Sequence, residues 1–184
     1  MRRLFIPLTL LVLTLAACEM PLEEIPDGPL TCSAGWFVTG YFTPVESDYR
    51  GPSETIRIPG FGNVTANSAF LRDVEVQGWG KTIAGWYVAY YDGKWNRSTV
   101  PLGASGKPIE KGHVAVDPRV VRIGSLVRIN SIPTPWDTTN FRATDVGTAV
   151  AGQHVDVYTG VGASARAEAF RITTNEAEVC HNGG

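Results

Sequence analysis

The sequence predicts a mainly β fold in which short strands close into a barrel. Short runs rich in β-branched and aromatic residues recur along the chain, and Gly, Pro, Asn or Asp residues separate them. Their irregular spacing fits a closed barrel better than a sandwich of regular hairpins. One convincing helix comes late, at residues 163–170, where strong helix formers follow Gly160-Val161-Gly162.

Each strand is expected where such a run lies between breakers. The first is the aromatic run Trp-Phe-Val-Thr-Gly-Tyr-Phe, whereas the run His-Val-Ala-Val ends at the turn dipeptide Asp117-Pro118. Region 43–102 is the least regular, so we expect long loops or a small excursion from the barrel there, with a weaker helical pattern at residues 68–76. The expected strands are 36–42, 86–91, 113–116, 125–130, 140–144 and 155–159, with a last strand at 171–174.

The N-terminal residues have the pattern of an export signal. Arg2-Arg3 precedes an apolar run and then Ala16-Ala17, and the run is too short for a membrane-spanning helix, which takes about 20 apolar residues. Leu15-Ala16-Ala17-Cys18 resembles a bacterial lipobox, which implies a lipid on Cys18 and a lipoprotein anchored at the cell envelope. The alternative is a secreted protein with an incidental cysteine. The expected division is a signal peptide at 1–17, a polar tether at 18–31 and a folded domain at 32–184 with an irregular insertion near 43–102.

Two further cysteines, Cys32 and Cys180, lie at the two ends of the expected domain. Export leads to an oxidising compartment, so a disulfide between them is reasonable. Two unpaired thiols are the alternative.

Charge and length narrow the class of protein. Removing residues 1–17 takes away Arg2 and Arg3, so the 16 basic residues become 14 against 18 acidic ones, and the net charge changes from −2 to −4. No basic stripe is present, so nucleic acid is not an expected partner. The remaining length suits one domain with its own core, and we expect a monomer.

Three aspartates mark the most informative part of the chain. Asp117, Asp145 and Asp156 each lie beside a β-branched or small apolar run, which is typical of carboxylates carried at a strand or at its end. Carboxylates held by a rigid sheet make a candidate active site.

The segments 106–118, 123–129 and 143–158, with the 11-residue step from Asp145 to Asp156, resemble the three-aspartate (3D) domain of bacterial cell-wall proteins. That domain occurs in membrane-bound lytic transglycosylases of the MltA type. Residues 38–44, Val-Thr-Gly-Tyr-Phe-Thr-Pro, add to the resemblance because they are similar to a Thr-Gly-Tyr-Tyr-x-Pro strand of that type.

The resemblance implies a six-stranded double-psi β-barrel with a short C-terminal helix, and a groove in which peptidoglycan is cut between N-acetylmuramic acid and N-acetylglucosamine without water. Asp156 would protonate the leaving oxygen and then, as a carboxylate, take the proton from the C6 hydroxyl of the sugar. To begin protonated, it needs a pKa well above the usual value near 3.9. Burial or a neighbouring carboxylate can raise that pKa, and Asp145 is the natural neighbour.

Six residues are expected to contact the glycan. Asp117, Tyr41, Gly147 and Gly152 belong to the resembling segments, although Asp117-Pro118 is equally typical of a structural turn. Aromatic faces stack on sugar rings, so Trp79 and Trp95 are also expected contacts, whereas the aromatic residues between them are expected to fill a core.

The chain differs from the family pattern at residues 145–152, where Asp-Val-Gly-Thr-Ala-Val-Ala-Gly replaces Asp-Thr-Gly-Gly-Ala-Ile-Lys-Gly. A threonine hydroxyl and a lysine are therefore missing beside the groove. The chain is also shorter than the MltA type, in which a large second domain forms one wall. A reduced wall from residues 43–102 is expected here.

No metal or cofactor is expected, because His113, His154 and His181 have no metal-ligand spacing with cysteines or carboxylates. His154 would share a strand face with Asp156, where it would tune the site or fill the barrel. Two other functions stay open. One is a non-catalytic glycan-binding or expansin-like wall-loosening protein, and the other is a hydrolase in which Asp145 and Asp156 act as an acid and base pair.

Overall fold

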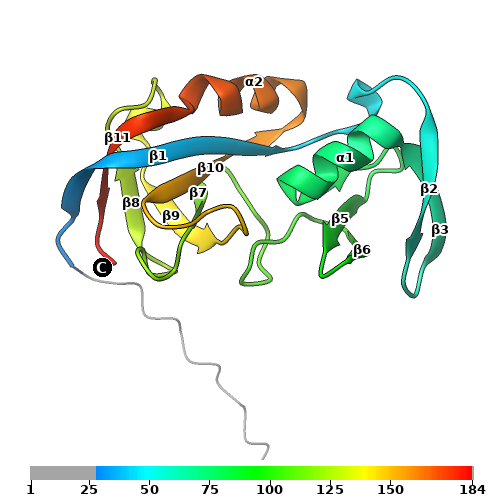
Figure 1. The fold of residues 1–184 in the computed structure, drawn as a ribbon, viewed down its shortest axis with the longest axis horizontal. Helices are drawn as coiled ribbons and strands as arrows, with labels where there is room; N and C mark the ends of the chain where they lie inside the picture. The colour runs from blue at the N-terminus through cyan, green and yellow to red at the C-terminus, as the bar shows by residue number, and fades with distance from the viewer. Residues whose placement is uncertain (1–27, 184) are drawn as a thin grey trace, which may run out of the picture.

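Six strands close into a barrel in the computed structural model, which describes residues 28–183 (Figure 1). The predicted signal peptide and Cys18 lie outside the described residues. Around the barrel the strand order is β1-β10-β7-β9-β8-β11. The strands are β1 (Thr31–Thr43), β7 (His113–Val116), β8 (Leu126–Ile129), β9 (Phe141–Asp145), β10 (His154–Val161) and β11 (Thr174–His181).

The barrel is mixed, with parallel pairs β1–β10 and β7–β9 and antiparallel pairing elsewhere. The predicted six-stranded β-barrel is confirmed, and helix α2 (Gly162–Ile172) extends the predicted helix at both ends. The last strand predicted at 171–174 is wrong, because residues 171 and 172 complete α2 and the strand starts at Thr174. Ile172 is 1 % exposed, so its apolar side chain completes the buried face of the helix.

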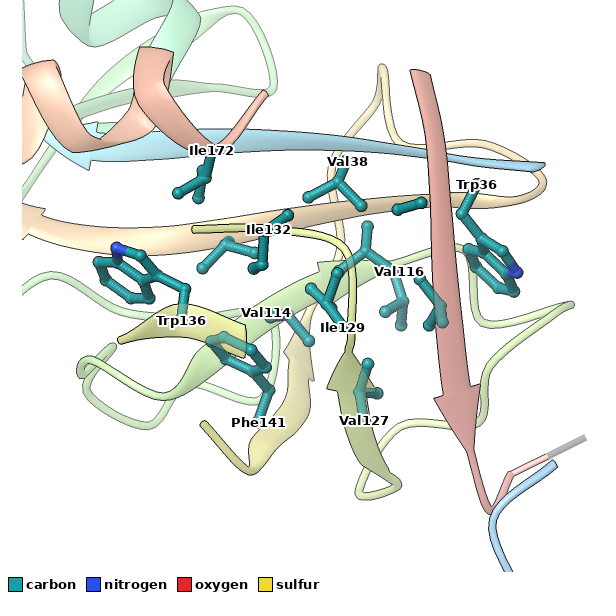
Figure 2. Packing of buried hydrophobic residues seen from close by; sticks show 14 of the residues in the cluster. Trp36, Val38, Val114, Val116, Val127, Ile129, Ile132, Trp136, Phe141 and Ile172 are labelled. Carbon is teal, nitrogen blue, oxygen red and sulfur yellow. The ribbon is translucent and has the colours of Figure 1, made fainter. Parts of the chain in front are cut away.

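The barrel interior is the main hydrophobic core (Figure 2). Inward-facing residues alternate with outward-facing ones along the strands, as the two-residue period of a strand requires. Trp36, Phe141 and Ile129 are the largest side chains that are fully buried there, and Trp136 stacks on Phe141 with ring centroids 6.3 Å apart. The valines of β7 and β10 fill the space between these larger groups.

Where the sequence suggested long loops, the chain forms an ordered insertion beside the barrel. Its own core contains Ile56, Phe70, Leu71, Val74 and Val88. The weak helical pattern at residues 68–76 is a real helix, α1. The insertion comprises a short 3-10 helix (Glu46–Asp48), the hairpin β2 (Ser53–Ile58) and β3 (Gly62–Asn67), helix α1 (Ser68–Gln77), and the sheet β4 (Trp79–Lys81), β5 (Tyr87–Tyr91) and β6 (Lys94–Ser98).

Polar side chains at the two ends of α1 hold the helix in place, and one of them connects the insertion to the barrel. The Asn67 side chain caps α1 by accepting hydrogen bonds from the backbone N–H groups of Ala69 and Phe70. At the other end of the helix, the Gln77 side chain accepts a hydrogen bond from the backbone N–H of Phe42 in β1, at 3.0 Å. Strand β1 therefore contacts both the barrel and the insertion, as Figure 1 shows.

A disulfide joins Cys32 and Cys180 at the far end of β1, across the register pair that links β1 to β11. Their Cα atoms are 3.9 Å apart, and the link spans 148 residues of sequence. Within residues 28–183, no helix has the length and apolar character needed to cross a bilayer.

The contact between β1 and α2 depends on a glycine. A Cβ atom built at Gly40 would lie 2.5 Å from the Cα and 2.9 Å from the Cβ of Ala169. We expect Gly40→Ala to lower the free energy of unfolding by about 1–3 kcal/mol, because one of these atoms belongs to the helix backbone and cannot rotate away. Denaturant unfolding of the variant checks this.

Gly28→Ala is the matched control, because its nearest neighbour would lie 3.8 Å from the new Cβ. If both variants were as stable as the unmodified protein, the close packing of α2 on β1 would not be a constraint.

Candidate active site

Four residues on adjacent strands form a row across one end of the barrel. Thr39 on β1 is in register with Asp156 on β10, Asp156 with Ala115 on β7, and Ala115 with Asp145 on β9. Neighbouring strands lie about 4.8 Å apart, so the two aspartates are two strand spacings apart with Ala115 between them. A small side chain between two carboxylates leaves room for a ligand.

This row forms one wall of a cleft of about 560 Å³. The barrel contributes Ala115, Asp145, Asp156 and the loop from Val146 to Val150. The opposite wall comes from the insertion, through the end of α1, strands β4 and β5, and a loop that begins at Leu102. The expected wall from the region 43–102 is therefore present and built from ordered elements.

The Asp156 carboxyl lines the cleft and is largely buried. The Thr39 hydroxyl donates a hydrogen bond to its Oδ1 at 2.6 Å. Burial is the main cause that raises the pKa of Asp156, the Thr39 hydrogen bond lowers it, and the nearby Asp145 raises it by a smaller amount, so the pKa is about 6. This carboxyl can therefore carry a proton at mildly acidic and near-neutral pH.

The Asp145 carboxylate accepts hydrogen bonds from three donors. Its Oδ1 accepts from the backbone N–H groups of Ala104 and Val146, both at 2.9 Å, and its Oδ2 accepts from the Tyr41 hydroxyl at 3.2 Å. Burial raises the pKa of Asp145, whereas these donors lower it. Asp145 thus ties β9 to the loop at Ala104 and to β1, and its effect on the pKa of Asp156 is smaller than that of burial.

Asp117, an expected substrate contact, lies outside the cleft and binds neighbouring groups of the protein. It is 3 % exposed and does not line the cleft. Its carboxylate accepts hydrogen bonds from the Arg119 side chain, at 2.7 and 2.9 Å, and from the backbone N–H of Gly152 at 2.8 Å. These bonds, led by Arg119, hold the pKa of Asp117 well below its usual value.

Gly152 also lies outside the cleft and anchors its loop. With φ at 68°, it adopts the left-handed conformation that glycine tolerates best. Its hydrogen bond to Asp117 fixes the end of the loop whose earlier residues, from Val146 to Val150, line the cleft. Asp117 and Gly152 therefore hold that loop in place from outside the cleft.

Three of the six predicted contacts line the cleft, and Trp95 joins Asp117 and Gly152 outside it. Tyr41, Trp79 and Gly147 are lining residues, and the Trp79 Nε1–H donates to the Leu102 carbonyl at 2.8 Å. Trp95 instead packs against the core of the insertion and lines a separate hollow beside the β2–β3 hairpin. Trp95 therefore lies apart from the cleft, on a side of the hairpin that its polar sequence context did not reveal.

Sequence reasoning missed four residues of this region. Tyr90 and Tyr91 were expected in a core, but their side chains are 37 % and 49 % exposed and line the cleft. Thr39 and Ala115 complete the row; both lie in the segments that resemble the family, but sequence alone assigned neither of them a role in the site. Their role follows from the register of four strands. This register brings together residues more than 100 positions apart in the sequence.

Among the described residues, the one group of His, Cys, Asp and Glu side chains that could hold a metal ion together is Cys32, Glu178 and Cys180. Its two sulfurs are joined to each other in the disulfide. This group lies at the β1–β11 register pair, away from the cleft residues.

Residues 112–176, which hold all three aspartates, match the profile of the 3D domain. This chain contains a 3D domain. No protein of curated function matches the sequence.

Solved lytic transglycosylases share the fold of this 3D-domain protein. E. coli MltA with bound chitohexaose matches with a TM-score of 0.60 and 16 % identity, over 79 % of this chain and 70 % of MltA. The membrane-bound lytic murein transglycosylase from Agrobacterium tumefaciens has a TM-score of 0.57 and 16 % identity, over 80 % and 73 % of the two chains. MltA from Neisseria gonorrhoeae has a TM-score of 0.55 and 16 % identity, over 82 % and 72 %.

The buried Asp156 makes the stability of the 3D domain depend on pH. Its pKa is about 6 in the folded protein against a usual value of 3.8, so the native state binds more protons between about pH 4 and pH 6, and stability falls as pH rises through that window. We expect Asp156→Asn to remove this loss of stability at higher pH. The gain in unfolding free energy over wild type should be larger at pH 7 than at pH 4, by up to about 3 kcal/mol.

Denaturant unfolding at the two pH values measures this difference. Asp92→Asn is a control for loss of one charge, because Asp92 is exposed in the turn after β5. Equal effects of Asp156→Asn at pH 4 and pH 7 would show that burial does not perturb this carboxyl.

Proposed function

We propose that this protein is a peptidoglycan lytic transglycosylase that cleaves the β-1,4 bond between N-acetylmuramic acid and N-acetylglucosamine and leaves a 1,6-anhydro end. The observation that carries the proposal is Asp156, a buried carboxyl with a pKa of about 6 that lines a cleft and is held by Thr39. A general acid of this kind works best when its pKa is near the working pH.

One carboxyl suffices for both proton transfers. Protonated Asp156 gives its proton to the glycosidic oxygen as the bond from that oxygen to C1 breaks. The C6 hydroxyl of the same muramyl residue then bonds to C1 and loses its proton to the Asp156 carboxylate. The products are a free hydroxyl on the leaving sugar, a 1,6-anhydro ring and Asp156 in its starting protonated form.

The surroundings of Asp145 favour this single-acid scheme over hydrolysis. An inverting hydrolase needs a second carboxylate free to activate water. Asp145 already accepts hydrogen bonds from two backbone N–H groups and the Tyr41 hydroxyl, which fill three of about four acceptor positions on its carboxylate. Its contacts suit a residue that organises the cleft and favours a proton on Asp156.

The cleft suits an extended glycan. Its volume of about 560 Å³ lies between two walls, and the exposed rings of Tyr90 and Tyr91 offer faces on which sugar rings can stack. The similarly folded E. coli MltA binds chitohexaose, a chain of β-1,4-linked N-acetylglucosamine. We infer that glycan strands of the cell wall occupy this cleft.

The cell envelope is the expected location. The lipobox-like residues 15–18 support a lipid on Cys18, with residues 18–31 as the tether that lets the domain reach the wall. A lipid anchor of this kind needs no membrane-spanning helix.

Digestion of purified sacculi, followed by mass spectrometry of the soluble fragments, tests the proposed reaction. Wild-type protein should release fragments with 1,6-anhydro ends, and activity should decline as pH rises above about 6, the pKa of Asp156. Asp156→Asn should lower the rate about 10⁴-fold or more, because one residue serves as both acid and base.

Asp145→Asn is the matched comparison. It should cost less, and its pH optimum should stay close to that of wild type, because burial and not Asp145 is the main cause of the raised pKa of Asp156. Reducing ends in place of anhydro ends would indicate a hydrolase. Binding of sacculi without cleavage by the wild-type protein would indicate a wall-binding protein.

A further inference from the structure

His154 is connected to the Asp156 carboxyl through one hydroxyl group. The Thr39 Oγ1 atom lies 2.9 Å from Nε2 of His154 and 2.6 Å from Oδ1 of Asp156. The other ring nitrogen of His154, Nδ1, lies 3.1 Å from the carbonyl oxygen of Ala149. The four groups form a chain of three short contacts that runs from the loop at Ala149 to the floor of the cleft.

The hydrogen atoms available to this chain limit how it can be protonated. The Ala149 carbonyl can only accept, so Nδ1 must carry a hydrogen for that contact to be a hydrogen bond. The Thr39 hydroxyl has one hydrogen and can donate it to only one of its two neighbours. Both Thr39 contacts can be hydrogen bonds at the same time only when one further proton is present. That proton is either on Nε2 of His154 or on the Asp156 carboxyl.

Two arrangements satisfy this condition. In the first, protonated Asp156 donates to Thr39, and Thr39 donates to Nε2 of a neutral imidazole. In the second, imidazolium Nε2–H donates to Thr39, and Thr39 donates to the Asp156 carboxylate. Each of two protons moves across one hydrogen bond between the two arrangements, so the total number of protons stays the same.

We propose that His154, Thr39 and Asp156 share one proton, and that His154 is the positioning residue through which Asp156 exchanges this proton with solvent. His154 is half-buried and does not line the cleft, whereas Asp156 does. A glycan in the cleft covers Asp156 and leaves His154 accessible from outside. The importance of this exchange for turnover rests on the proposed function, but the sharing itself does not.

The groups around the two residues permit such sharing. The Phe37 ring contacts His154 from β1, with centroids 4.6 Å apart, and adds no charge. Burial lowers the pKa of His154, and the bond to Ala149 opposes this shift. Asp145 on β9 and Tyr41 on β1 are the ionisable groups that act on Asp156 from the other side. Burial raises the pKa of Asp156 and lowers that of His154, so it brings the proton affinities of the two groups closer together.

Nuclear magnetic resonance of the free protein tests the proposal without substrate. The chain has three histidines, and comparison with His154→Gln assigns the ¹⁵N signals of His154. We expect neutral His154 to carry its hydrogen on Nδ1. We also expect the His154 ring and the Asp156 carboxyl carbon each to titrate in two steps with common midpoints, as strongly coupled groups do.

Thr39→Val removes the shared hydroxyl with little change in shape, so each group should then titrate in one step, with the midpoint of Asp156 higher and that of His154 lower. Thr39→Ser keeps the hydroxyl and should restore the two common steps. A neutral His154 protonated on Nε2, or a His154 titration that Thr39→Val leaves unchanged, would overturn the proposal. These outcomes do not depend on whether sacculi are cut, so failure of the proposed reaction is recognised separately.

Discussion

The parallel pairing of β1 with β10 is the interaction on which both the fold and the site depend. It places Thr39 opposite Asp156 and Phe37 opposite His154, so the hydroxyl that contacts the acid and the ring that contacts His154 come from one strand. One residue further along β1, Gly40 lets helix α2 approach the same strand. A shift of this register by one residue would turn Thr39 away from the carboxyl, because successive side chains point to opposite faces.

The three aspartates have different roles because their carboxylates accept different numbers of hydrogen bonds from the protein. Asp117 is occupied by Arg119 and the Gly152 N–H, and it fixes the end of the loop that lines the cleft. Asp145 is occupied by three donors and fixes the loop at Ala104 on the other side. Asp156 accepts a hydrogen bond from Thr39, and its carboxyl lines the cleft, where it is available for proton transfer. Two aspartates therefore shape the cleft, and the third is suited to the chemistry.

Much of the barrel could be predicted because each strand is a short β-branched run between breakers, and the 3D pattern placed Asp145 and Asp156 at strand positions. The insertion was harder to predict. Strand β2 reads Ser-Glu-Thr-Ile-Arg-Ile and β6 reads Lys-Trp-Asn-Arg-Ser, so both are too polar for a hydrophobic pattern to reveal. The Asp92-Gly93 turn, with φ of 54° and 71°, was a usable signal for the hairpin between β5 and β6.

Side-chain roles that depend on distant pairing could not be predicted in the same way. Thr39 meets Asp156 across 117 residues of sequence, and Ala115 lies between two aspartates only because β7 pairs with both β9 and β10. Tyr90 and Trp95 are neighbours in space, with ring centroids 5.1 Å apart, yet one lines the cleft and the other does not. Aromatic content alone did not distinguish them.

The central claim is that burial at the cleft keeps the Asp156 carboxyl protonated at a pH where an ordinary aspartate is ionised. The most direct measurement is a ¹³C titration of the Asp156 carboxyl in the wild-type protein. We expect its main ionisation near pH 6, far above the usual value of 3.8. A midpoint close to 3.8 would contradict the claim, because Asp156 would then lack the proton that the proposed reaction requires.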